Sequence, residues 1–179
     1  MKISIMKISI TCTLATIAAM AAIIVSVPSR AQTATTRDQL VGSWQIVSFK
    51  ATASDKVGYP LGENPSGYAG FTPARFGLML IDSSRQAPAA AAMTDAEAAS
   101  LMKSHAAYTG KYDVDPAQTP DGIKITVHVD AASNQALVGA NRVFFARIDG
   151  DKLTVKSPAI VVPTTGLTSV VQLEFVKAD

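Results

Sequence analysis

Apolar and polar residues alternate most regularly between positions 123 and 130. Four aliphatic residues at odd positions are separated by polar ones: Ile123, Ile125, Val127 and Val129 against Lys124, Thr126, His128 and Asp130. A period of two is typical of a strand that has one face against a core. These residues are therefore predicted to form a half-buried strand, with His128 on its polar face.

Other apolar runs of strand length are separated by turn residues. They lie at residues 42–50, 68–72, 76–81, 111–114, 143–148, 153–155 and 170–176. Asp149 and Gly150 form a strong tight-turn signal between two of these runs. Residues 58–67 are rich in Gly and Pro and predict a loop. About eight short strands with turns between them are typical of a barrel or a sandwich.

One helix is expected, beginning at Thr94. Thr94 and Glu97 have the spacing of a capping box, in which each side chain satisfies a free backbone N–H. Residues at helical spacing follow: Ala98, Leu101, Met102, His105 and Ala106. They form a narrow stripe that would lie against a sheet, and Gly110 ends the helix. A single helix offers too few crossovers for a parallel α/β fold.

The first 31 residues have the layout of a secretory signal peptide. Lys2 and Lys7 give a positive start, an apolar stretch follows at residues 14–27, and small residues precede a cleavage site at Gln32. An uncleaved anchor is the alternative, because residues 8–27 are long enough to span a bilayer. Residues 1–5 are repeated at 6–10, so the start lies at Met1 or Met6. We expect a domain of residues 32–179 that is periplasmic or secreted.

Setting residues 1–31 aside changes the charge and the cysteine content. Three of the 16 basic residues and none of the 14 acidic ones lie there, which leaves 13 against 14 and a net charge of −1. This balance gives no support to a nucleic-acid partner. The only cysteine, Cys12, lies in the same segment. The mature chain would therefore have no disulfide, no thiolate catalysis and no cysteine-bound zinc.

Three segments resemble the bacterial lipocalin-like domain family. They are residues 40–49, residues 59–68 with the following Phe71-Thr72-Pro73, and residues 110–115. The most specific is the string Tyr-Pro-x-Gly-x-x-Pro-x-Gly-Tyr at 59–68. The resemblance implies an all-β fold with one helix, namely an eight-stranded antiparallel lipocalin-like β-barrel. Such a barrel encloses room for side chains or for one small ligand. The chain departs from the family at Ala74, where Gly is frequent, and at Val127, where many members have a second His.

Three tyrosines and one histidine are the candidate ligand-binding residues. Tyr108 and Tyr112 share strand parity and would point into the barrel mouth, although each could instead be a core tyrosine bonded to backbone. Tyr68 borders the loop at 58–67, which would serve as a lid. His128 can exchange a proton near neutral pH, but its parity points outward unless the polar face lines the cavity.

Trp44 is expected to close the base of the barrel as a core residue. The resemblance implies an arginine from a late strand over its indole, for which Arg142 and Arg147 are the candidates. His105 and His128 lie on different predicted elements and give no metal-ligand spacing. No nucleophile elbow, P-loop or dinucleotide fingerprint is present, so neither a catalytic residue nor a cofactor is predicted.

The sequence favours an exported barrel that binds a small hydrophobic or amphipathic molecule and has no enzymatic activity. One alternative is a cofactor-free isomerase, cyclase or hydrolase that uses a tyrosine or His128 in the same cavity. The other is an interaction module of the cell envelope, with a barrel filled by its own side chains and an exposed apolar patch.

Overall fold

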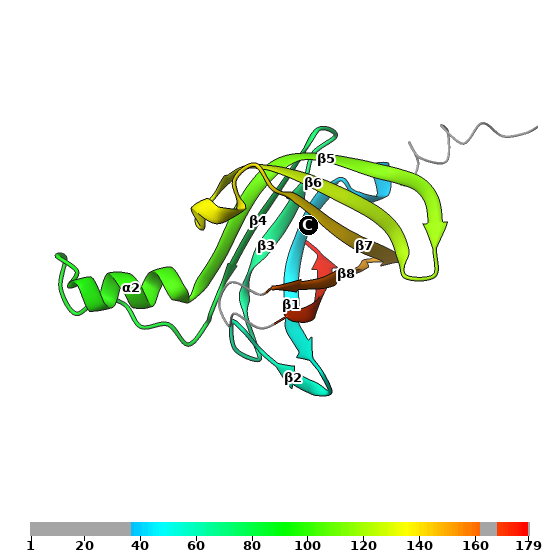
Figure 1. The fold of residues 1–179 in the computed structure, drawn as a ribbon. Coiled ribbons are helices and arrows are strands. Elements are labelled where there is room, and N and C mark those ends of the chain that lie inside the picture. Colours follow the sequence, from blue (N-terminus) through cyan, green and yellow to red (C-terminus); the bar gives the residue numbers. More distant parts are fainter. Residues whose placement is uncertain (1–36, 162–167, 179) are drawn as a thin grey trace, which may run out of the picture.

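The computed structural model describes residues 37–161 and 168–178 (Figure 1), apart from the side chain of residue 116. The signal peptide predicted at residues 1–31, its cleavage site and the alternative start at Met6 lie outside the described residues. The domain predicted at 32–179 is described for most of its length.

Nine strands make up most of the described chain. They are β1 (Gly42–Ala53), β2 (Lys56–Gly58), β3 (Ser66–Phe71), β4 (Arg75–Ile81), β5 (His105–Thr119), β6 (Gly122–Ala132), β7 (Asn141–Asp149), β8 (Lys152–Val161) and β9 (Thr168–Lys177). The helix α2 (Asp95–Lys103) precedes β5, and a 3-10 turn, η1 (Gln135–Leu137), precedes β7. Residues 37–40 form a helical turn before β1.

The strands form one closed antiparallel barrel. Their order is β2-β1-β3-β4-β5-β6-β7-β8-β9, and the pairing of β9 with β1 closes the ring. β2 pairs only with the end of β1 and extends as a short arm, so eight strands form the barrel. This confirms the predicted all-β class and the eight-stranded antiparallel barrel.

Inward-facing apolar side chains fill one end of the barrel. On β6 the predicted alternation is confirmed, since Ile125, Val127 and Val129 are at most 3% exposed. Trp44 is fully buried, and its Nε1 donates a hydrogen bond to the carbonyl of Leu40 at 2.8 Å. The helical turn at 37–40 thereby caps this end, which we call the closed end.

The cation over Trp44 is Lys177, whose Nζ lies 5.6 Å from the centre of the ring system. This corrects the expectation that Arg142 or Arg147 covers the indole. Arg142 lies at the start of β7 and lines the cavity described below. Arg147 donates instead to the carbonyls of Pro120 and Asp121, in the turn between β5 and β6.

The helix α2 has the predicted start but a different end and environment. Its capping box is present, with the Glu97 carboxylate accepting from the Thr94 N–H at 2.8 Å. It ends at Lys103, has no buried residue and projects from one end of the barrel (Figure 1). His105 and Ala106 belong to β5, where pairing with β4 satisfies their backbone groups and outweighs local helix propensity. At its other end β5 continues through residues 115–119, where Gln118 and Thr119 pair with Ile123 and Gly122 of β6.

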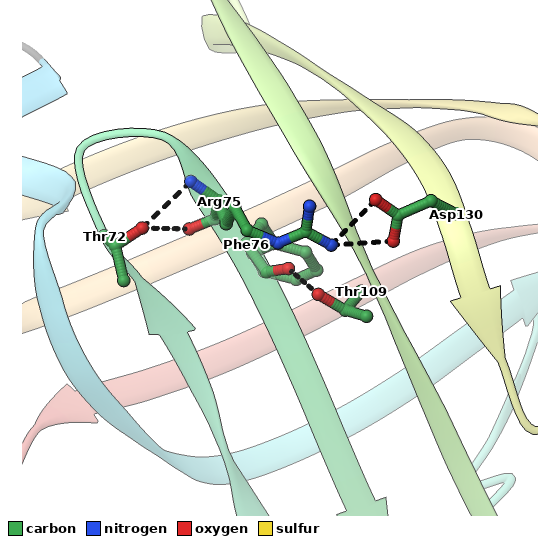
Figure 2. A network of polar contacts seen from close by, with 5 residues as sticks. All are labelled: Thr72, Arg75, Phe76, Thr109 and Asp130. Atoms are coloured by element: carbon green, nitrogen blue, oxygen red, sulfur yellow. Dashed lines mark hydrogen bonds and ion pairs between the residues drawn. The ribbon is translucent and has the colours of Figure 1, made fainter.

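The turn between β3 and β4 is shaped by a threonine, without glycine (Figure 2). Figure 2 shows the Thr72 hydroxyl accepting from the Arg75 N–H at 2.9 Å and donating to the Arg75 carbonyl at 3.2 Å. The Thr72 N–H donates to the same carbonyl at 2.8 Å. Arg75 then crosses the outer face, where its Nη2 lies 2.7 Å from both carboxylate oxygens of Asp130. Thr109 adds a hydrogen bond of 2.7 Å to the carbonyl of Phe76. These contacts tie β4, β5 and β6 together from outside.

Candidate ligand-binding site

The end of the barrel that lies next to η1 and the last turn of α2 contains a cavity of about 480 Å³. This volume falls within the range of about 300 to 1,000 Å³ that is typical of small-molecule sites. A separate void of about 30 Å³ lies among core side chains such as Phe71, Phe76 and Val127. The described barrel is thus packed at the closed end and hollow at the other, which we call the open end.

The wall of the cavity is mostly apolar and comes from the inward faces of several strands. It includes Phe49 of β1, Leu78 of β4, Phe144 of β7 and Leu173 of β9. Leu61, from the Gly- and Pro-rich loop, is fully buried and contributes to the same wall. A wall of this kind takes up the apolar part of a ligand by removing it from water.

Arg142 places a positive charge within this apolar surface. It has the same strand parity as Phe144, and on β6 its register partner is Val127, which is 1% exposed. Its Cζ lies 5.8 Å from the centre of the Phe144 ring. Within residues 37–161 and 168–178, Arg142 makes no hydrogen bond and no ion pair. The guanidinium therefore has no anionic partner in the described protein.

Tyr108 lines both the cavity and the smaller void below it. Burial raises the pKa of its phenol well above the ordinary value, and the nearby charge of Arg142 acts in the opposite direction without cancelling that effect. Tyr108 is therefore a neutral phenol at physiological pH. Its hydroxyl has no hydrogen-bond partner among the described residues.

The rim of the cavity is polar and carries positive charge. Lys103 comes from the last turn of α2. Gln135 is the first residue of η1, and Asn134 directly precedes it. His105 also lines the cavity, and its Nδ1 lies 2.9 Å from the Leu101 carbonyl. Because a carbonyl only accepts, Nδ1 carries the proton of this imidazole. No Asp or Glu is found among the lining residues of the described chain.

The three candidate tyrosines lie in three different environments. Tyr108 and Tyr112 both face inward, but only Tyr108 reaches the cavity. Tyr112 is 2% exposed, and its hydroxyl donates to the Thr72 carbonyl at 2.9 Å, so it is a core residue of the closed end. Tyr68 is 50% exposed, in register with Met79 on the outer surface, and does not form part of a lid.

His128 lies on the outside of the barrel, as its strand parity predicts, and does not line the cavity. Its side chain is 45% exposed. Its Nε2 lies 2.7 Å from the Asp113 carboxylate, and its Nδ1 lies 2.8 Å from Oδ1 of Asn141. The proposed ligand-binding role of His128 is therefore corrected to a hydrogen-bonded position on the surface.

A pH effect follows from these two hydrogen bonds. The bond to Asp113, and then the bond to Asn141, raise the pKa of His128 above its ordinary value of 6.5. A raised pKa gives stability that is complete below pH 6.5 and is lost as the pH rises through the folded-state pKa.

We expect Asp113→Asn to lower the pKa of His128 in an NMR titration, with His105→Gln used to assign the two imidazoles. Asp130→Asn is the control, and an unchanged pKa in Asp113→Asn would contradict the assignment.

Three charged or titratable residues of the cavity are missed by the sequence patterns: Lys103, His105 and Arg142. His105 is missed because the predicted helix runs past the position where β5 begins. Lys103 is helical as predicted but lies outside the apolar stripe of that helix. For Arg142 a signal exists, since it precedes Phe144 and Ala146 at a spacing of two, and both are buried. An arginine with the parity of buried neighbours indicates a charge inside the barrel.

The described residues contain neither a cluster of metal-binding side chains nor a membrane-spanning helix. No group of three or more His, Cys, Asp or Glu residues comes close enough together there to hold a metal ion. No helix in the same part of the chain is long and apolar enough to cross a membrane.

A closed eight-stranded antiparallel barrel with a ligand-sized cavity at one end is the architecture of lipocalin-type binding proteins. The family model described as the lipocalin-like domain matches residues 41–172. The chain therefore belongs to the lipocalin-like domain family, which confirms the resemblance seen in its sequence. No curated protein and no solved structure shows significant similarity to the chain.

Proposed function

We propose that this protein binds one small hydrophobic or amphipathic molecule in the cavity beside Tyr108. The observation that carries the proposal is the cavity itself, which combines a volume of about 480 Å³ with an apolar wall and a few polar groups. Ligand sites in proteins have this composition, with an apolar lining for affinity and isolated polar groups for orientation. Burial of about 200 Å² of apolar ligand surface would contribute on the order of 5 kcal/mol before the costs of association.

The two alternative functions have less support. An enzyme that depends on His128 would need this imidazole in the cavity, and His128 lies on the outer surface. His105 does line the cavity, but its Nδ1 lies 2.9 Å from the Leu101 carbonyl rather than beside another titratable side chain. A tyrosine-dependent enzyme would use Tyr108, which has no base within hydrogen-bond distance among the described residues. An interaction module with a filled barrel is disfavoured by the cavity.

We further propose that the protein is exported, with cleavage before Gln32. The support is the sequence of residues 1–31, with its positive start, apolar stretch and small residues before the cut. N-terminal sequencing of protein recovered from the periplasm or the culture medium tests this. A mature chain that begins well before Gln32 would contradict the cleavage site.

Ligand binding is tested with N-phenyl-1-naphthylamine, an uncharged fluorophore that brightens in apolar surroundings. We expect saturable binding of one molecule per protein, and a loss of affinity of at least about tenfold in Ala106→Trp. Ala106 faces inward at the cavity, so an indole at this position would occupy the space of the ligand.

Met79→Trp is the matched control, because Met79 is 55% exposed on the outer face and its replacement adds an indole outside the cavity. It should bind the fluorophore as the unmodified protein does. Circular dichroism would show that both variants are folded. The absence of saturable binding, or equal binding by Ala106→Trp, would reject the proposal.

A further inference from the structure

We propose that the natural ligand is an organic acid whose anionic group binds to Arg142 and Tyr108 while its apolar body lies against the cavity wall. This inference rests on the proposed function and adds the chemical class of the ligand. Nothing in the wall of Phe49, Leu78 and Leu173 requires a charged ligand. The polar groups that face the same space are what favour an acid.

Arg142 offers a positive charge to a ligand in the cavity. Arg142 is partly buried beside the apolar wall, and the described protein offers its charge no carboxylate. An anion that binds there would pair with this guanidinium in surroundings less polar than water. The Phe144 ring, whose centre lies 5.8 Å from Cζ, does not neutralise the charge. The flat guanidinium carries several N–H groups in a fork that matches the two oxygens of a carboxylate. An acid in the cavity would supply the missing partner.

Tyr108 offers a hydrogen-bond donor to the same cavity. Its hydroxyl lacks a hydrogen-bond partner in the described chain, and its raised pKa keeps the proton on the phenol. Because the phenol is neutral, it does not form an ion pair with Arg142. It can instead donate a hydrogen bond to an anionic group of the ligand. Arg142 and Tyr108 come from different strands, β7 and β5, and both line the same cavity. They therefore offer two kinds of donor to a single anionic group.

The charges on the rim point to the same ligand class. The ionisable groups that line the cavity are Lys103 from α2, His105 and Tyr108 from β5, and Arg142 from β7. None of the lining residues in the described ranges is acidic. A site lined by charge of one sign attracts ligands of the opposite sign and disfavours cationic ones. The cavity is thus suited to an acid rather than to an amine.

Two fluorophores with the same ring system separate charge from shape. 8-Anilinonaphthalene-1-sulfonate carries a sulfonate, and N-phenyl-1-naphthylamine lacks it. We expect Arg142→Met to weaken sulfonate binding by about tenfold to hundredfold, the range for hydrogen bonds to a charged group. The same change should leave binding of the uncharged fluorophore equal or stronger, because methionine makes the cavity more apolar. Opposite effects on the two fluorophores cannot result from misfolding.

Lys156→Met is the matched control, because Lys156 is exposed on β8 and its replacement removes the same charge outside the cavity. It should change neither affinity by more than about twofold. Tyr108→Phe should weaken sulfonate binding by roughly twofold to tenfold, the value of one hydrogen bond. Because the hydroxyl has no partner in the described protein, this variant should unfold at the same temperature as the unmodified protein or at a higher one.

The outcomes separate this inference from the proposed function. If both fluorophores bind and Arg142→Met affects them equally, the acid-binding inference is overturned while the cavity remains a binding site. If Lys156→Met has the same effect as Arg142→Met, the effect comes from net charge and the inference is again overturned. If neither fluorophore binds the unmodified protein, the proposed function and the inference both fail.

Discussion

Replacing Gly110 with alanine is expected to destabilise the barrel by about 3 kcal/mol or more, among the largest effects of a single methyl group. A Cβ at this position would lie 2.0 Å from the carbonyl oxygen of His128 and 2.7 Å from its carbonyl carbon. Both atoms are backbone of the neighbouring strand β6, so the strands must separate to admit the methyl group. The register between β5 and β6 shifts between Thr109 and Gly110, which marks the site of close approach.

Thermal unfolding followed by circular dichroism measures this effect, with an expected decrease in Tm of roughly 10 °C. Gly70→Ala is the matched control, because a Cβ at Gly70 on β3 would meet no atom within 4 Å. That variant should unfold within about 0.5 kcal/mol of the unmodified protein. Equal Tm values for the two variants would show that β5 and β6 do not approach as closely as described.

Trp44→Ala is expected to cost about 3 to 5 kcal/mol of stability, the range for truncating a large buried aromatic side chain. Trp44 is fully buried at the closed end, where its indole donates to the Leu40 carbonyl at 2.8 Å. Its removal would leave a cavity and also leave that carbonyl without its indole donor. Denaturant unfolding followed by circular dichroism is the measurement, because Trp44 is the only tryptophan and the variant has no indole fluorescence.

Two further variants locate the source of the loss. Trp44→Phe keeps most of the buried ring and removes the indole donor, so it should cost about 1 to 2 kcal/mol. Tyr68→Ala removes an aromatic side chain that is 50% exposed on the outer face. It should change stability by less than about 0.5 kcal/mol. A cost for Tyr68→Ala as large as that for Trp44→Ala would argue against the closed end as the main source of stability.

The sequence predicts the barrel well because period-two patterns and turn residues are local signals. The alternation at residues 123–129 becomes the inward and outward faces of β6, and Asp149-Gly150 becomes the turn between β7 and β8. The extent of β5 is predicted poorly. His105 and Ala106 continue a helical pattern, and only their pairing with Ile81 and Leu80 makes them strand residues. That pairing depends on the closed barrel and is not visible in local sequence.

The candidate site is predicted only in part. Tyr108 is placed correctly by parity, whereas Tyr112 has the same parity and lies in the core. Strand parity states which face a residue occupies but not how far along the barrel it lies, so it cannot separate these two tyrosines. The expectation that Arg142 covers Trp44 fails for the same reason, since the position along the barrel axis decides which group it meets.

The separation of the closed end from the open end has a consequence for how this protein can change. Trp44 at the closed end and the outer contacts across β4, β5 and β6 help to hold the barrel together. Neither Trp44 nor the side chains that make those outer contacts line the cavity. Residues such as Lys103, Gln135 and Arg142 border the cavity and are not part of the buried core. Substitutions among them are expected to change the lining of the cavity while leaving folding largely unaffected, which the proposed binding function would register as a change of ligand. In this barrel, the lining of the open end can therefore change without a change in the packing of the closed end.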